Sequence, residues 1–282
     1  METRQIPLKA YEDMAFLKGE HCRPVRLQLE YLKPEIAMHD KNIRSTIVLF
    51  GSARLPTPES AREGLERVRA EHDRAPDDPE VRERLRLAHI RMEQSHYYEM
   101  AREFASIVSR CAQRDDTCDF VIMTGGGGGI MEAGNRGAND VGAKSIGLNI
   151  TLPFEQEPNA YITDDLCFQF HYFSIRKMHF LLRARALCAF PGGFGTMDEV
   201  FETLTLIQTG KIEPIPVVLF GGEFWRDVIN WELFVERGLV SPDDLDIVRF
   251  CDTPVEAWDY IRNYWSYNQN GTTAENRSDP SD

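Results

Sequence analysis

The sequence predicts an α/β protein: a Rossmann-like, doubly wound, mostly parallel sheet with helices on both faces, in a single domain with an N-terminal helical arm. Short apolar segments alternate with amphipathic segments along most of the 282 residues, which is the pattern of strands alternating with helices. Three of the predicted strands are also followed directly by turns rich in Gly and Ser. Because the carboxyl ends of parallel strands meet at one edge of the sheet, where such folds bind ligands, we expect these turns to lie together there.

The N-terminal arm is predicted over residues 1–44, as short helices with breaks at Pro24 and Pro34. The main domain is predicted over residues 45–265. From Ser266 to the last residue the composition is Asn, Gly, Thr, Ser and Asp, which predicts a disordered tail over 266–282.

The main domain is expected to alternate strands and helices in chain order. The strands are predicted at residues 46–50, 119–124, 144–150, 166–173, 186–190, 215–220 and 247–251, and the helices at 130–139, 174–184, 196–209, 223–237 and from Thr253 onward.

An insertion interrupts this alternation after the first strand. Residues 56–80 are polar and contain prolines, which predicts a loop or insertion. A long amphipathic helix dense in Arg and Glu should follow, from about Pro79 to Cys111. We therefore expect a helical insertion over residues 56–96.

Composition and charge exclude several classes of function. The net charge of −13 argues against general binding to nucleic acid, which needs a basic surface. No apolar run approaches the ~20 residues that cross a bilayer, so no membrane partner is expected. The six cysteines are scattered without a Cys-x-x-Cys pair, which indicates reduced thiols and a cytoplasmic location.

The most informative segment, residues 186–209, is an apolar strand, a glycine loop and a helix in one run. Gly192, Gly193 and Gly195 let the backbone turn tightly and approach a ligand. Thr196 is predicted to open the helix, whose free N–H groups and dipole form an anion site. Glu199, one turn later, would face the same ligand. The alternative is structural: Thr196 and Glu199 also fit a capping box, which would explain both residues without a ligand.

A second glycine loop, residues 125–129, also follows a strand and opens a helix. The Gly-x-Gly-x-x-Gly spacing of a dinucleotide site fails here, because the sixth position of a motif that starts at Gly125 is Ile130 and not Gly. NAD is therefore not expected, whereas a nucleoside monophosphate or another small anion is. The alternative is a loop that needs glycines only to turn.

Arg176 and Lys177 are predicted to lie in the first turn of a helix capped by Ser174. Two cations there oppose the helix dipole, and such local misfits gather at functional sites. Salt bridges to surface acids are the alternative. Glu155, after the third strand, could accept hydrogen bonds from a ribose or a base, or be one more surface carboxylate.

Other chemistries lack their motifs. His171 and His179 form no metal pair, and neither His-Glu-x-x-His nor Gly-x-Ser-x-Gly occurs. We therefore expect no metal and no cofactor.

One motif is similar to that of a known family. The run Pro191-Gly-Gly-Phe-Gly-Thr-Met-Asp-Glu199 resembles the Pro-Gly-Gly-x-Gly-Thr-x-x-Glu motif of the LOG ("Lonely Guy") family, cytokinin riboside 5′-monophosphate phosphoribohydrolases often mislabelled as lysine decarboxylases. The Arg176-Lys177 pair, the 125–129 loop and Phe50-Gly-Ser match too, so the resemblance spans about residues 45–260. The arm and the insertion resemble the longer bacterial branch of the family.

The resemblance implies hydrolysis of the N-glycosidic bond of nucleoside 5′-monophosphates, AMP or N6-substituted cytokinin ribotides, to free base and ribose 5-phosphate. It implies that Arg176 and Glu199 are the catalytic pair. It also implies a homo-oligomer, a dimer or hexamer, with the site near the subunit interface. The implied substrate-binding residues are Gly51, Ser52, Gly126, Gly127, Met131, Glu155, Lys177, Gly192, Gly193, Phe194, Gly195, Thr196 and Thr205.

A non-catalytic protein is the alternative. Related folds carry molybdenum cofactor, and such a carrier, or a sensor of a phosphorylated nucleotide, would need the glycine loops but not the acid. The presence of both Arg176 and Glu199 favours the enzyme.

Overall fold

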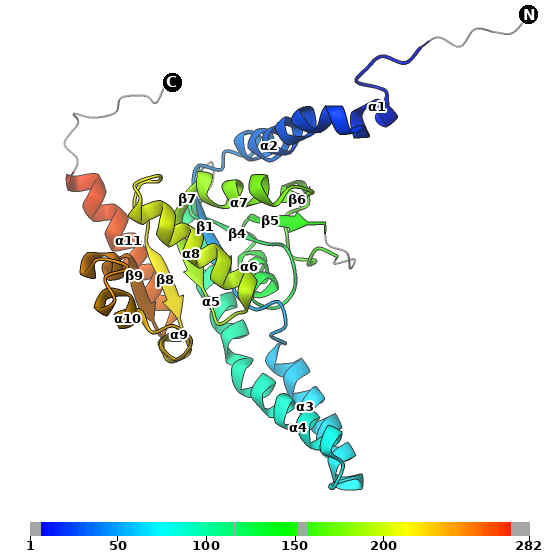
Figure 1. Cartoon of the computed structure of the whole chain (residues 1–282), viewed down its shortest axis with the longest axis vertical. Coiled ribbons are helices and arrows are strands. Elements are labelled where there is room, and N and C mark those ends of the chain that lie inside the picture. The colour runs from blue at the N-terminus through cyan, green and yellow to red at the C-terminus, as the bar shows by residue number, and fades with distance from the viewer. Residues whose placement is uncertain (1–6, 115–116, 152–156, 272–282) are drawn as a thin grey trace, which may run out of the picture.

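The computed structural model describes residues 7–114, 117–151 and 157–271. Its centre is a seven-stranded sheet in the order β6-β5-β4-β1-β7-β8-β9, and every pairing in it is parallel (Figure 1). The predicted α/β fold is confirmed, and the sheet is wholly rather than mostly parallel. All seven predicted strands are present, as β1 (Thr46–Phe50), β4 (Val121–Thr124), β5 (Ser145–Ile150), β6 (Cys167–Phe170), β7 (Ala184–Ala189), β8 (Val217–Phe220) and β9 (Val248–Cys251).

The strand order places the candidate loops side by side. Strands β4, β5 and β6 lie on one side of β1, whereas β7, β8 and β9 lie on the other. The chain therefore changes direction across the sheet between β1 and β7. In parallel sheets such a switch point leaves a crevice beyond the carboxyl ends of the two strands, and ligands bind in it.

Helices cover both faces of the sheet, as predicted. Residues of β1 alternate between two apolar cores because successive side chains of a strand point to opposite faces. Val48 packs in the core that contains Phe180 and Val200, and Ile47 in the core that contains Phe104 and Ile130. The first core thus belongs to α7 (Phe173–Leu182) and α8 (Phe194–Gln208), and the second to α5 (His96–Ala112), α6 (Ile130–Asn139) and α11 (Pro254–Gly271).

Residues 56–80, predicted as a loop or insertion, are mostly helical. Helix α3 (Pro58–Arg74) begins after Thr57, whose hydroxyl accepts a hydrogen bond from the Ser60 N–H. The predicted long helix is interrupted near Ser95, which separates α4 (Pro79–Gln94) from α5. Helices α3 and α4 form a hairpin that protrudes from the body (Figure 1). Nearly all of the hairpin surface is solvated, so its sequence is as polar as that of a loop.

The N-terminal arm holds α1 (Met14–Lys18) and α2 (Arg23–Asp40). Pro24 lies in the first turn of α2, where a proline costs no hydrogen bond. The predicted break at Pro34 is wrong, because α2 continues through it. The Pro34 ring is buried, so packing offsets the intrahelical hydrogen bond that a proline removes.

Two further boundaries differ from expectation. The helix predicted over 223–237 is divided into α9 (Gly222–Val228) and α10 (Trp231–Glu236), since the Asn230 side chain accepts a hydrogen bond from Leu233 N–H and starts a new helix. Helix α11 continues past Ser266 to Gly271, so the predicted start of the tail is wrong. Residues 272–282 lie outside the described residues. The remaining elements are short: η1 (Glu20–Cys22), β2 (Gln113–Arg114), β3 (Thr117–Cys118), η2 (Asp164–Leu166) and η3 (Pro242–Ile247).

Candidate active site

The three turns predicted to converge do so. The Ser52 N–H, after β1, donates to Pro191 O, after β7, at 3.1 Å. The carbonyl of Ser52 accepts from the Ile130 N–H, after β4, also at 3.1 Å. Gly51 has to be a glycine, because a Cβ there would lie 2.7 Å from the Ile130 side chain. Gly51 and Ser52 therefore join the two glycine loops directly.

Helix α8 begins earlier than predicted, and it has no capping box. Its first residue is Phe194 and its N-cap is Gly193, so Thr196 is the third helical residue. The N–H groups of Thr196 and Met197 donate to Gly193 O at 3.0 and 3.1 Å, and no side chain caps the helix. The structural alternative for Thr196 and Glu199 is thereby removed, and the first-turn N–H groups lie at the switch point.

Gly192 lies so close to its neighbours that a side chain at this position would clash with them. A Cβ at this position would lie 2.7 Å from Thr196 Cβ and 3.1 Å from Ser52 N. Thr196 itself is buried. The loop thus packs directly on the start of α8, so the glycine fixes where the helix begins.

Glu199 is a buried carboxylate, 8% exposed. Burial raises the pKa of Glu199 to about 7, and the negative charges of Glu202 and Asp198 act in the same direction. Lys177 and Arg176 favour the charged form and oppose this shift. Arg176 and Lys177 alone would lower this pKa and hold Glu199 ionised, but burial outweighs the two cations.

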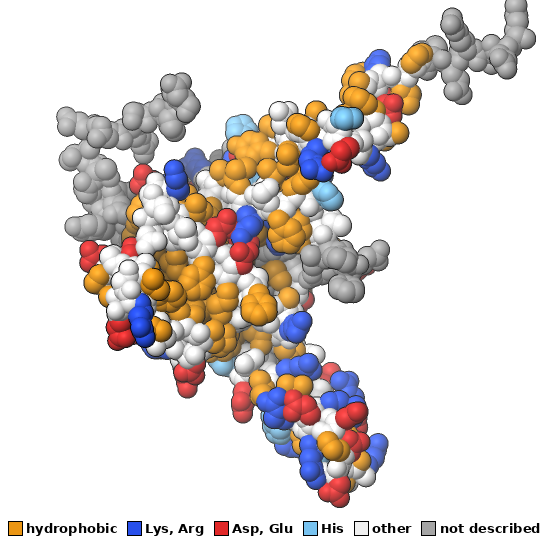
Figure 2. All heavy atoms as spheres, viewed as in Figure 1, with side chains coloured by type: hydrophobic (Ala, Val, Ile, Leu, Met, Phe, Trp, Pro, Cys, Tyr) orange, Lys and Arg blue, Asp and Glu red, His pale blue; other side chains and the backbone are white. Residues whose placement is uncertain are grey.

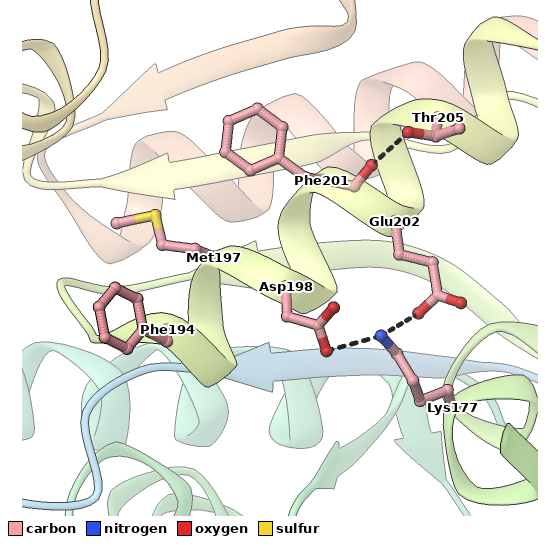
Figure 3. Close-up of a pocket in the computed structure, with 7 residues that line it drawn as sticks. All are labelled: Lys177, Phe194, Met197, Asp198, Phe201, Glu202 and Thr205. Atoms are coloured by element: carbon pink, nitrogen blue, oxygen red, sulfur yellow. Dashed lines mark hydrogen bonds and ion pairs between the residues drawn. The ribbon is translucent and has the colours of Figure 1, made fainter. Parts of the chain in front are cut away.

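Lys177 connects the acids of α8. Its Nζ lies 2.7 Å from both Asp198 and Glu202 (Figure 3). The same atom lies 3.9 Å from Glu199 Oε1. Burial lowers the pKa of Lys177, but the hydrogen bonds to Asp198 and Glu202 outweigh it and the net pKa is raised. Lys177 is therefore a firmly charged cation between three carboxylates.

Arg176 faces the glycine loops instead of an acid. Its Nε donates to Leu148 O at 2.7 Å, and a terminal nitrogen lies 3.5 Å from Gly125 O. The guanidinium also lies 5.0 Å over the Phe180 ring. Burial lowers the pKa of Arg176, while Glu199 opposes that shift. Carbonyls and an aromatic face thus hold the cation at the edge of the sheet.

Helix α7, which carries both cations, starts differently than predicted. Ser174 does not cap it; the N-cap is Tyr172, without a side-chain cap. Arg176 and Lys177 therefore follow the first three helical residues, and both have acceptors from other elements. The predicted conflict with the helix dipole is relieved by these tertiary contacts.

The 125–129 loop closes the other side of the site. Gly126 has a φ of +77°, and its carbonyl accepts from Asn159 N–H at 2.9 Å. A Cβ on Gly125 would lie 2.6 Å from the Arg176 guanidinium and 2.8 Å from the Met131 sulfur. Met131 and Arg176 therefore both approach the backbone of this loop. The carbonyl of Gly127, also a predicted site residue, accepts from Asn159 Nδ2 at 3.0 Å.

A hollow of about 450 Å³ opens on the outer side of α8. Phe194, 96% exposed, stands at its rim, and Thr205 lines it while its hydroxyl donates to Phe201 O at 2.8 Å. Gly195 lies beside Phe194 in the first turn. Glu155 lies outside the described residues. The hollow is lined by Lys177, Phe194, Met197, Asp198, Phe201, Glu202 and Thr205 (Figure 3).

Sequence inspection missed four side chains of this site. Asp198 and Glu202 bracket Glu199 on one helix, and Asn149 and Asn159 lie against the 125–129 loop. Asn149 carried a usable signal, since it is a polar residue near the end of an apolar strand at the predicted edge. Asn159 carried none, because a long connection separates it from the loop in sequence.

Among the described residues, no three His, Cys, Asp or Glu side chains lie close enough together to hold a metal ion. In the same part of the chain, no helix combines the length and apolar character needed to cross a membrane.

The fold and this geometry define an α/β protein whose candidate site lies at the switch point of a parallel sheet. A family model described as "Possible lysine decarboxylase" matches residues 131–261, which include Arg176 and Glu199. Over that segment the chain is similar to this family, and it shows distant homology to the cytokinin riboside 5′-monophosphate phosphoribohydrolases of the LOG family. The predicted resemblance is confirmed.

The similarities to individual proteins are partial. The probable cytokinin riboside 5′-monophosphate phosphoribohydrolase LOGL3 of Oryza sativa subsp. japonica is 31% identical over 94 residues, 33% of this chain and 44% of the rice protein. The phosphoribohydrolase LOG3 of Arabidopsis thaliana is 26% identical over 148 residues, 51% of this chain and 67% of that protein. The X-ray structure of TM1055 matches 78% of this chain and 99% of its own, at 18% identity and a TM-score of 0.47.

Proposed function

We propose that this protein hydrolyses the N-glycosidic bond of nucleoside 5′-monophosphates, AMP or its N6-substituted derivatives, to free base and ribose 5-phosphate. The observation that carries the proposal is Glu199: a buried carboxyl group with a pKa raised to about 7, in the second turn of a helix that starts at the switch point. The similarity to phosphoribohydrolases supports the same reaction.

The phosphate is assigned to the start of α8. The first N–H groups of the helix, at Phe194 and Gly195, have no intrahelical acceptor and carry the positive end of its dipole. Such a helix start binds phosphate readily. Binding energy from the phosphate, which does not react, can then position the sugar at Glu199.

Glu199 carries the chemistry. Cleavage of an N-glycosidic bond passes through an oxocarbenium-like transition state, which a nearby carboxylate stabilises. The same carboxylate can orient or deprotonate the attacking water, and a pKa near 7 suits a base at neutral pH. Arg176, held by Leu148 O, is placed to orient the substrate.

Decarboxylation of lysine is disfavoured by the state of Lys177. An amine nucleophile has to lose its proton, which usually requires a lowered pKa. The pKa of Lys177 is raised instead, since Asp198 and Glu202 hold the ammonium against burial. Lys177 is thus suited to balance the carboxylates and not to form a Schiff base.

On this proposal the protein acts as a cytoplasmic homo-oligomer.

A substrate panel tests the proposal. The protein is incubated with AMP, N6-isopentenyl-AMP, GMP and CMP, and released base is measured by chromatography. We expect free base from at least one adenine nucleotide. No base from any of the four would contradict the proposal, and a ligand retained through purification without turnover would favour the carrier instead.

Glu199→Gln separates the catalytic role from a structural one. The amide keeps the shape but cannot act as a base, so we expect kcat to fall by roughly 10²–10⁴-fold. Glu232→Gln, at an exposed position of α10, is the matched control and should keep full activity. An active Glu199→Gln protein would remove Glu199 from the mechanism.

A further inference from the structure

Asn159 binds the glycine loop that follows β4 through both its backbone and its side chain. Its N–H donates to Gly126 O at 2.9 Å. Its side-chain Nδ2 donates to Gly126 O at 3.2 Å and to Gly127 O at 3.0 Å. Asn159 lies in the connection between β5 and η2, far from the loop in sequence. One residue of that connection therefore supplies donors to two successive carbonyls of the loop.

The Asn159 amide is fixed in one orientation. Its Oδ1 accepts from the Tyr161 N–H at 3.1 Å, as in an Asx turn, so Nδ2 is the atom that faces the loop. Nδ2 also donates at 2.9 Å to Asn135 Oδ1, which accepts from the Thr124 hydroxyl at 2.7 Å. Asn135 is wholly buried and donates to Ser145 Oγ at 3.0 Å. The amide is therefore the outer end of a buried hydrogen-bond network that reaches β4 and β5.

The backbone of Gly126 is enclosed from other sides as well. Its φ of +77° lies in the region that favours glycine. A Cβ at this position would collide with the Asn149 side chain, which is 5% exposed. The Gly126 N–H donates to the Thr124 hydroxyl at 3.0 Å. The loop therefore has one conformation, in which the carbonyl of Gly126 faces Asn159.

This conformation also sets the direction of the N–H groups in the loop. The peptide bonds after Gly126 and Gly127 are trans, and in a trans peptide the N–H points opposite to the C=O. Because both carbonyls face Asn159, the N–H groups of Gly127 and Gly128 point away from it. Neither N–H has an acceptor among the residues that the structure describes, although Gly127 is buried. A buried N–H needs a partner, so both groups are suited to donate to a ligand.

We propose that Asn159 is a positioning residue of the candidate site: its amide fixes the 125–129 loop so that the N–H groups of Gly127 and Gly128 donate to the bound nucleotide. Asn159 contacts no reacting atom and acts through the loop. The identity of the ligand rests on the proposed function. The effect of Asn159 on the loop does not, because it can be measured without a ligand.

Hydrogen exchange of the ligand-free protein tests the effect on the loop. Asn159→Asp keeps the shape of the side chain, but a carboxylate has no hydrogen to donate to the loop carbonyls. We expect faster exchange at the Gly126 and Ile130 amides, measured by mass spectrometry of peptides that span residues 124–131. Asn263→Ala, at an exposed position of α11, is the matched control and should exchange like the wild-type protein. Unchanged exchange in Asn159→Asp would overturn the proposal, whatever reaction the protein catalyses.

Steady-state kinetics tests whether the loop serves the reaction. The substrate is AMP or N6-isopentenyl-AMP, whichever releases base faster. Donors that bind the nucleotide equally before and during the reaction affect KM alone, so KM should rise roughly 10-fold in Asn159→Asp while kcat changes less than about threefold. Asn159→Ala also lacks the donor and should show the same result, which keeps the test valid if the aspartate variant unfolds.

The remaining outcomes separate this proposal from the proposed function. A lower midpoint of thermal unfolding with an unchanged KM would mean that Asn159 is only structural, and would overturn the proposal. Wild-type protein that releases no base from any nucleotide would contradict the proposed function instead. The exchange experiment would then still decide whether Asn159 fixes the loop.

Discussion

At the scale of single residues, the candidate site depends on the balance around Glu199. Two cations favour its charged form, yet burial and two neighbouring carboxylates raise the pKa to about 7. Lys177 is shared by three acids, so its charge is divided among Asp198, Glu202 and Glu199. The result is a carboxyl group that changes its protonation state near neutral pH.

This balance predicts the pH dependence of the reaction. Only the ionised form of Glu199 can act as a base, so kcat/KM should rise with pH and level off above about 7. Lys177→Met removes the cation that most lowers the pKa of Glu199, so the rising limb should move to higher pH. Initial rates of base release from pH 5 to 9 measure the rising limb of the wild-type protein and of the variant. If the limb lies at the same pH in Lys177→Met as in the wild-type protein, a group other than Glu199 controls it.

At the scale of elements, the start of α8 decides the geometry. Gly192 packs on Thr196 and Ser52 N, so the loop after β7, the loop after β1 and the helix form one unit. Gly195, only three residues later, has open space where its Cβ would lie. Packing therefore requires glycine at position 192 but not at position 195.

This contrast predicts opposite outcomes for two alanine variants. Gly192→Ala should push α8 away from the β1 loop, lowering thermal stability and weakening phosphate-dependent binding. Gly195→Ala fills open space inside a helix, where alanine is favoured over glycine by ~1 kcal/mol, and should be neutral or stabilising. Thermal unfolding and titration with AMP measure both. Equal stability of the two variants would contradict the packing argument.

At the scale of the whole molecule, two projections extend from one compact sheet (Figure 1). The α3–α4 hairpin buries little beyond Ala61, Val81 and Ala88, and its surface is charged (Figure 2). The arm instead presents apolar side chains to solvent. The two projections therefore differ in the chemistry of their surfaces: the hairpin is charged and the arm is apolar.

Removal of the hairpin should therefore leave the fold intact. Replacing residues 58–94 by a short Gly/Ser linker keeps Leu55 and the whole of α5, which contribute to the core beside β1. We expect one cooperative unfolding transition with a midpoint within a few degrees of the full chain, measured by circular dichroism. Loss of cooperative unfolding would show that the hairpin belongs to the core.

The sequence by itself determined the fold and the loops of the site. Apolar strands and glycine turns are local patterns, so all seven strands and the convergence of Gly51, the 125–129 loop and Gly192 were predictable. Helix boundaries were less so, because the α8 start at Phe194 and the continuation of α2 through Pro34 depend on packing. Only the tertiary structure decided the direction of the Glu199 pKa shift, the role of Lys177 among three acids and the exposure of the apolar side chains of α2. Each depends on burial and on neighbours distant in sequence, which no local pattern encodes.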